Sequence, residues 1–174
     1  MTERFEQLQK SSECLYTIGS PLVIAATALL KDTQTGEILA QVKFQNIGNQ
    51  KIVAVFADFE AKDISGDALN GVINFQFLDL NAKRNEYFGS KTAANIPDGR
   101  TRQIVINIKR VVFADKTAWD APANAIWSPI VMHPLAETFE NVDLIEQYRR
   151  ETIAKAKYTP EDVLDLWVCT CGAY

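Results

Sequence analysis

Side chains from Ile38 to Gln45 alternate between apolar and polar, which is the two-residue period of a β-strand covered on one face. The apolar set is Ile38, Ala40, Val42 and Phe44. Residues 46–50 are rich in turn formers and include Gly48, so the chain can reverse there. The next segment, residues 52–63, begins apolar on both faces, as a central strand of a two-layer structure does. We therefore expect these two strands to form a hairpin around which the chain is organised.

The same pattern predicts further short strands in the first two thirds of the chain. They cover residues 22–30, 73–79, 87–93 and 104–113, with a short return that ends at Trp119. At Lys109 and Arg110 the alternation slips by one residue, which predicts a β-bulge. About seven short strands joined by turns are typical of an antiparallel β-sandwich with immunoglobulin-like architecture. The fold class that we expect is therefore mainly β, with a helical appendage at the C-terminal end.

The N-terminal segment and a proline-rich stretch flank these strands. We expect residues 2–10 to form a short helix or arm, because Phe5 and Leu8 fall on one side of a helix. Residues 120–134 combine prolines with large apolar side chains, so neither a helix nor a central strand suits them. We expect this stretch to be a loop that covers one end of the sandwich, which would bury its apolar side chains.

The C-terminal segment has a helical pattern. Residues 141–156 place apolar side chains near one face and charged ones on the other. Pro160 and the two acidic residues after it predict a second short helix, since proline and acids favour the first helical turn. We therefore divide the chain into a β-sandwich domain with its arm and covering loop, residues 1–135, and a helical tail, residues 136–174.

Composition narrows the class of protein. The 174 residues are 47% hydrophobic, which supports one well-filled core without a second large domain. The formal net charge of -4 is spread along the chain, so we do not expect a nucleic-acid surface. No apolar run is long enough to span a membrane, and the charged N-terminus is unlike a secretory signal. Three cysteines, an odd number, do not form a disulfide framework, which favours a cytoplasmic location.

The segment Cys169-Thr170-Cys171-Gly172 is the one constellation with the character of a chemical site. Two closely spaced thiolates followed by glycine are the kind of ligand pair that zinc sites use. A complete site needs two more ligands, and no second cysteine pair follows. Three interpretations stay open: half of a zinc ribbon, a vestigial tail, or a site that two chains share. Cys169 and Cys171 are our predicted metal ligands, and zinc is the predicted cofactor.

No set of residues predicts an active site. His133 is the sole histidine and has no partner nearby in the sequence, so we expect a packing role for it. We expect Cys14 to act as a small buried apolar residue. Acidic pairs such as Asp63 and Asp67 fall in turns, where carboxylates have structural reasons to be. We therefore expect neither catalytic nor cofactor-binding residues other than the two cysteines, and no enzymatic activity.

Two segments resemble known bacterial families. Val42-Lys43-Phe44-Gln45-Asn46, together with the turn Asp63-Ile64-Ser65-Gly66, resembles FxLYD-like immunoglobulin-like domains. The segment from Tyr158 through Trp167 to Gly172 looks like the entry into a zinc ribbon of the Cys-x-Cys-Gly type. The combination resembles an uncharacterised family of cytoplasmic proteins from Gram-positive bacteria that join such a sandwich to a ribbon. This resemblance implies a binding or assembly role and carries over no catalytic residue.

The expected function is therefore that of a non-enzymatic protein-interaction or assembly module. Loops or an edge strand of the sandwich would contact a protein partner, and a second copy of the chain is one candidate for that partner. The alternative is a nucleic-acid-associated regulator that acts through a zinc ribbon incomplete in this chain; the acidic charge balance counts against it.

Overall fold

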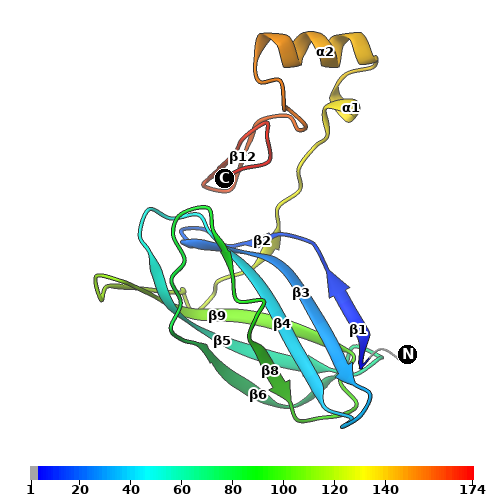
Figure 1. The fold of residues 1–174 in the computed structure, drawn as a ribbon, viewed down its shortest axis with the longest axis vertical. Coiled ribbons are helices and arrows are strands. Elements are labelled where there is room, and N and C mark those ends of the chain that lie inside the picture. The colour runs from blue at the N-terminus through cyan, green and yellow to red at the C-terminus, as the bar shows by residue number, and fades with distance from the viewer. Residues whose placement is uncertain (1–3) are drawn as a thin grey trace.

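Antiparallel β-sheets make up most of the protein in a computed structural model that describes residues 4–174 (Figure 1). The first sheet contains β1 (Phe5–Ser11), β2 (Leu15–Tyr16), β3 (Leu22–Asp32), β4 (Ile38–Asn46), β7 (Tyr87–Phe88), β8 (Ala93–Ile96) and β11 (Ser128–Pro129). The second sheet has the order β10 (Ala118–Asp120), β9 (Gln103–Phe113), β5 (Ile52–Lys62) and β6 (Ala68–Phe77). The prediction of a mainly β, antiparallel structure is confirmed.

The predicted hairpin of β4 with β5 is wrong. β4 pairs with β3, β7 and β8 in the first sheet, whereas β5 lies between β9 and β6 in the second. The turn at residues 46–50 therefore carries the chain from one sheet to the other. Asn46 is fully buried there, and its side-chain amide donates to the carbonyls of Gln50 and Ala82 at 2.8 and 2.9 Å. Alternation reports that a strand has a covered face, but it does not tell whether the next strand lies beside it or opposite it.

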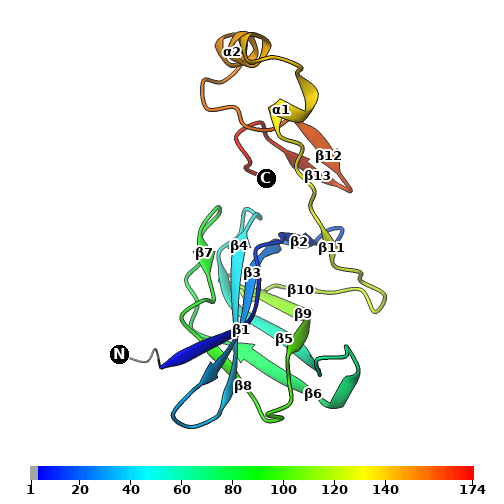
Figure 2. The same cartoon turned by 90° about the vertical axis from the view of Figure 1, so that its right-hand side faces the viewer.

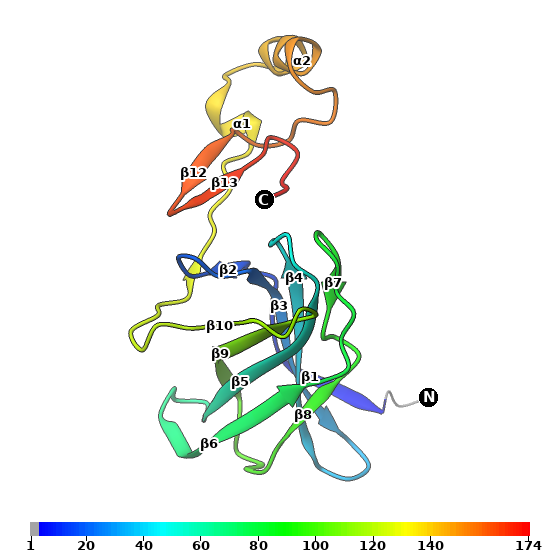
Figure 3. The ribbon, with the colours of Figure 1, turned by 90° about the vertical axis from the view of Figure 1, so that its left-hand side faces the viewer.

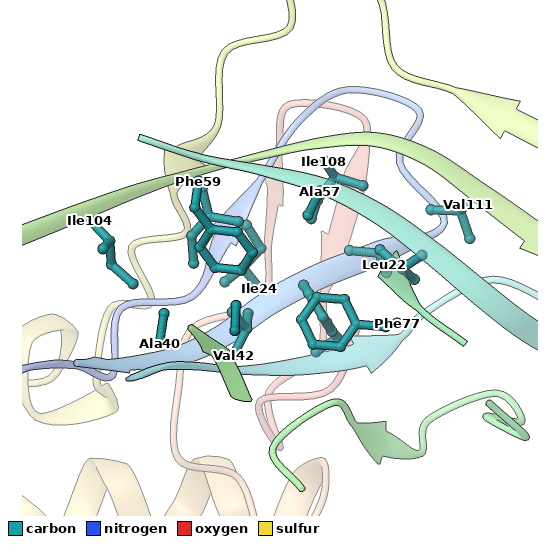
Figure 4. Packing of buried hydrophobic residues seen from close by; sticks show 14 of the residues in the cluster. Leu22, Ile24, Ala40, Val42, Ala57, Phe59, Phe77, Ile104, Ile108 and Val111 are labelled. Carbon is teal, nitrogen blue, oxygen red and sulfur yellow. The ribbon is translucent and has the colours of Figure 1, made fainter. Parts of the chain in front are cut away.

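Side chains from both sheets meet in one apolar core (Figure 4). The inward residues of β4 predicted from the alternation are all fully buried. Phe44 of β4 contacts Phe77 of β6 edge to face, with ring centroids 5.1 Å apart, and Phe75 extends this contact along the second sheet. Such aromatic pairs add about 0.5–1.5 kcal/mol to the energy of burial. The rings therefore tie the two sheets together.

The predicted bulge on β9 is present. Phe56 pairs with Arg110 and Ala57 pairs with Ile108, so Lys109 is the extra residue on that strand. The bulge keeps both Ile108 and Val111 buried despite the slip in the pattern. As Figure 4 shows, these two side chains reach the core from β9. A one-residue insertion thus restores the inward face of the strand.

Two predicted helices are strands. The N-terminal segment forms β1, which pairs with β3, and residues 2 and 3 of the predicted helix lie outside the described residues. The segment after Pro160 forms β12 (Glu161–Val163), which pairs with β13 (Leu166–Val168). Both segments are too short to be stable as isolated helices, and each gains a backbone partner as a strand. β8 and the short α1 (Leu135–Thr138) were not predicted.

The longer C-terminal helix is confirmed in part. α2 (Val142–Glu151) is shorter than the predicted range and begins after Asn141, whose side chain accepts a hydrogen bond from the Leu144 amide at 2.9 Å. None of its residues is buried. The views in Figures 2 and 3 agree that α2 lies far from the sheets, with the β12–β13 hairpin between them.

The proline-rich stretch only partly covers the sheets. Trp127 packs against the main core and Ile130 is buried. Ile126 and Val131, in contrast, are 75% and 58% exposed. The expectation that this loop buries its large side chains therefore holds for two of these four residues.

Gly89 lies close against the core residue Phe44. Its φ is +88°, and a Cβ at this position would lie 2.7 Å from the Phe44 ring and 2.8 Å from the Val42 carbonyl oxygen. Gly66 has the same φ but open space around it. A comparison of alanine substitutions at the two glycines therefore separates the energetic cost of backbone strain from that of steric crowding.

We expect Gly66→Ala to lower the free energy of unfolding by about 1–2 kcal/mol, the cost of a left-handed backbone for a residue with a Cβ. We expect Gly89→Ala to lower it by at least about 3 kcal/mol, because displacement of the Phe44 ring adds to that strain. Urea denaturation of both variants measures the difference. Equal losses would contradict the close approach of Gly89 to Phe44.

Candidate functional site

The structure brings Cys169 and Cys171 together in a tight turn that follows β13. The Cys171 thiol donates to the Cys169 sulfur, with the two Sγ atoms 3.3 Å apart. Cys171 is exposed and Cys169 is half-buried. The two predicted ligands are therefore neighbours in space, on the surface of the C-terminal segment.

Backbone contacts hold this turn in place. The amide of Gly172 donates to the Cys169 carbonyl at 2.8 Å, and the amide of Lys157 donates to the Thr170 carbonyl at 2.8 Å. Gly172 has a φ of +87°, and a Cβ there would lie 3.0 Å from the Tyr158 ring. Glycine is thus required at this position both for its backbone angle and for space.

Several hydrogen-bond donors face the Cys169 sulfur. The backbone amide of Cys171, followed by its thiol, lowers the pKa of Cys169 below the usual range of a thiol. The hydroxyl of Thr170 acts in the same direction. Donors that face a sulfur stabilise its negatively charged form.

The described residues do not fit a closed zinc site. Structural zinc is bound by four ligands in a tetrahedron. Within residues 4–174, no three or more His, Cys, Asp or Glu side chains gather in a way that could hold a metal ion. Cys14, the third cysteine, shares a hydrogen bond with the Tyr174 side chain instead, and burial raises the pKa of Cys14. Cys169 and Cys171 therefore provide at most half of such a site.

His133 lies between two carboxylates on the C-terminal segment. Its Nδ1 is 3.5 Å from an oxygen of Glu137, and its Nε2 is 4.0 Å from an oxygen of Glu161. These are ion-pair separations that are long for hydrogen bonds. The imidazole is about half exposed and faces no nucleophile among its described contacts.

The acidic pairs considered from the sequence have structural partners. Asp63 accepts from the backbone amides of Ser65 and Asp67 within one turn. Asp120 forms a two-armed ion pair with Arg110 across β10 and β9, which lowers the pKa of Asp120. Carboxylates engaged in this way hold turns and strands rather than substrates.

A latch joins the C-terminal hairpin to the first sheet. The Tyr16 hydroxyl donates to one oxygen of Asp165 at 2.8 Å, and the Gly19 amide donates to the other at 2.9 Å. Beneath the latch, Val168 packs with Tyr16, Val23 and Ile130 in a second apolar cluster. Burial, and then the bond to the Asp165 carboxylate, raises the pKa of Tyr16 to about 12. The latch therefore fixes the cysteine turn relative to the sheets.

An apolar hollow of about 400 Å³ opens beside this latch. Ile18, Ile126 and Leu164 contribute to its lining, and each is more than half exposed. Exposed apolar side chains that gather on one surface are common where proteins bind partners.

The free edge of the second sheet is the other prominent surface. β6 pairs with β5 on one side only and is the last strand of its sheet. Its sequence, ALNGVINFQF, contains neither a charged residue nor a proline. Backbone N–H and C=O groups along the outer side of an edge strand are available to another strand.

Comparisons with known protein families, with characterised proteins and with solved structures found no match. The resemblance to a sandwich joined to a zinc ribbon, and the zinc ligation that it implies, therefore stay predictions. No helix among the described residues is long and apolar enough to cross a membrane.

Neither the latch nor the position of β6 at the edge of its sheet was predicted from the sequence. Tyr16 and Asp165 are 149 positions apart, and nothing local in the sequence relates them. The absence of charge from Ala68 to Phe77 is a readable signal of an unprotected strand. It gains meaning only once this strand is known to be at an edge.

We expect Asp165→Ala to loosen the C-terminal hairpin, because it leaves the Tyr16 hydroxyl and the Gly19 amide without their acceptor. The free energy of unfolding should decrease by about 1–2 kcal/mol, since hydrogen bonds to a charged acceptor are strong but Asp165 is solvent-accessible. Amide hydrogen exchange in β12 and β13 should accelerate. Asp162→Ala, an exposed change on the same hairpin, is the control; the same acceleration in both variants would contradict the latch.

We expect a decrease in stability between about pH 10 and 12 to which Tyr16 contributes. The pKa of Tyr16 is about 12 in the folded protein, above its ordinary value of 10. The stabilisation is therefore complete below pH 10 and is lost as the unfolded phenol ionises first. Denaturation at pH 9 and pH 11.5 measures the loss. Tyr16→Phe should reduce it, and an unchanged loss in this variant would exclude Tyr16 as a source.

Proposed function

We propose that this protein is a non-enzymatic interaction module that accepts an extended segment of a partner protein along the open edge of β6. The observation that carries the proposal is the uncharged, proline-free sequence of this edge strand. Proteins usually protect such an edge with charges, prolines or a covering loop. An unprotected edge is the surface that strand addition requires.

The regular part of the edge is residues 72–77. Over this range each residue pairs with one residue of β5, from Val72 opposite Glu60 to Phe77 opposite Val55. Before Val72 the register shifts, so the beginning of β6 is irregular. An incoming strand would find six consecutive residues in regular geometry, which is close to the common length of a strand.

The side chains of β6 alternate between a face that packs into the core and a face that is exposed to a partner. Phe77 is buried and Ile73 and Phe75 pack against the core, so the inner face is already occupied. On the outer face Val72 is 53% exposed, and Gln76 is exposed as well. Backbone hydrogen bonds would provide affinity, and side chains beside Val72 would provide selectivity.

The opposite side of the same sheet is less accessible. The outer strand there is β9 over residues 103–109, because β10 pairs only with residues 110–112. The Gln9 side chain accepts from the Ile104 amide at 3.1 Å, and the Ala121 amide donates to the Lys109 carbonyl at 2.9 Å. Some backbone groups along this edge of β9 therefore already have hydrogen-bond partners, which favours β6 as the edge that binds a partner strand.

Strand order supports an immunoglobulin-like framework behind the edge. β3, β4 and β8 are neighbours in one sheet, and β6, β5, β9 and β10 follow one another in the other. The chain thus changes sheet after β4, after β6, after β8 and again after β10, and the first three changes are those of Greek-key sandwiches. In our proposal β5, paired on both sides, holds β6 in a fixed position for binding.

The test uses a random dodecapeptide library displayed on phage, selected against the whole chain. We expect the selected peptides to alternate in β-forming residues and to shift the amide resonances of β6. The double variant Val72→Lys with Gln76→Lys should weaken binding at least about tenfold, since two charges on the edge disfavour a paired strand.

The matched control makes the same two changes on the other edge. Val105→Lys with Gln103→Lys alters the outer face of β9, where Val105 lies opposite Glu60 just as Val72 does. This control should bind as the unaltered chain does. Peptides that shift β9 instead, or equal losses in both double variants, would refute the edge of β6 as the binding surface. Dimers that the β6 variant abolishes would identify a second copy as the partner.

A further inference from the structure

We propose that Cys169 and Cys171 form a reversible intrachain disulfide by exchange with a low-molecular-weight disulfide. This inference is independent of the proposed function, because the cysteine turn and the β6 edge are separate surfaces. It concerns a pair of thiols that the fold brings together.

The geometry of the turn favours a bond between these two sulfurs. Their separation of 3.3 Å exceeds a disulfide bond by only about 1.3 Å. Both side chains belong to one turn, whose ends are joined by the bond from the Gly172 amide to the Cys169 carbonyl. A rotation of the two side chains can therefore close the gap without moving β13.

Exposure gives the two cysteines different roles. Cys171 is exposed, so an external disulfide can reach it, whereas Cys169 is partly buried. Cys14 packs against the apolar cluster beneath the latch and shares a hydrogen bond with the Tyr174 side chain. We therefore assign first attack to Cys171, resolution to Cys169, and no part to Cys14.

The exchange balances in two steps. Cys171 first gives its thiol proton to the Cys169 sulfur that it faces. The Cys171 thiolate then attacks one sulfur of oxidised glutathione, forms a mixed disulfide and releases one glutathione thiolate, which takes up a proton. The Cys169 thiolate then attacks the Cys171 sulfur and releases the second glutathione. The protein loses two electrons and two protons, and the oxidised glutathione gains both. Excess reduced glutathione reverses both steps.

The shortage of metal ligands is consistent with this assignment. Two thiolates with no third His, Cys, Asp or Glu ligand among residues 4–174 form an incomplete zinc site. The second thiol beside the first makes the resolving step intramolecular.

The test incubates the reduced chain with oxidised glutathione and then measures free thiols under denaturing conditions and the intact mass. The unaltered chain has three thiols. We expect two of these thiols to disappear. The intact mass should decrease by two hydrogen atoms, and no glutathione should remain attached to the protein. Cys14→Ser should lose the same two. Cys169→Ser should accumulate glutathione on Cys171, at a level about tenfold or more above the unaltered chain, because its resolving thiol is missing.

Three results would overturn the proposal. One is a stable glutathione adduct on the unaltered chain, since the resolving step would then fail. Another is the loss of Cys14 together with one of the other thiols, which would assign a different pair. The third is complete protection of both thiols by one equivalent of zinc, which would assign the pair to metal binding.

Discussion

The contact between Phe44 and Phe77 is the interaction on which the rest of the structure depends. The first ring comes from β4 and the second from β6, so this contact spans the two sheets at the centre of their shared core. Phe75 extends the contact along the second sheet, and Gly89 allows the chain to pass directly over Phe44. Because interiors are close-packed, the rings fix the spacing of the sheets for every other core residue.

This arrangement anchors β6 on its inner face and leaves its outer edge open. The inward side chains of β6 are held in the core, while its outer edge has no neighbouring strand among residues 4–174. A strand fixed in this way presents its backbone in the conformation that a partner strand needs, so little entropy is lost on binding. The same packing that stabilises the sheets thus prepares the surface that we propose for recognition.

The C-terminal segment depends on a different kind of contact. Asp165 binds Tyr16 and Gly19 through its two oxygens, over an apolar cluster that includes Val168. This latch places the cysteine turn at one end of the sheets (Figures 1 and 2). The two sulfurs are therefore held away from the edge of β6, which is why the two proposals can be tested separately.

The sequence by itself determined the strands whose side chains alternate, the bulge at Lys109 and the proximity of Cys169 and Cys171, because each depends on residues close together in the chain. Only the tertiary structure decided that β4 and β5 belong to different sheets and that β6 is an edge. It also decided that residues 5–11 and 161–163 are strands. The partner of the first segment, β3, is distant in the sequence, and the partner of the second, β13, follows a turn that the sequence did not predict. Periodicity specifies which face of a strand is covered, whereas the neighbour that covers it is selected by packing across the whole core.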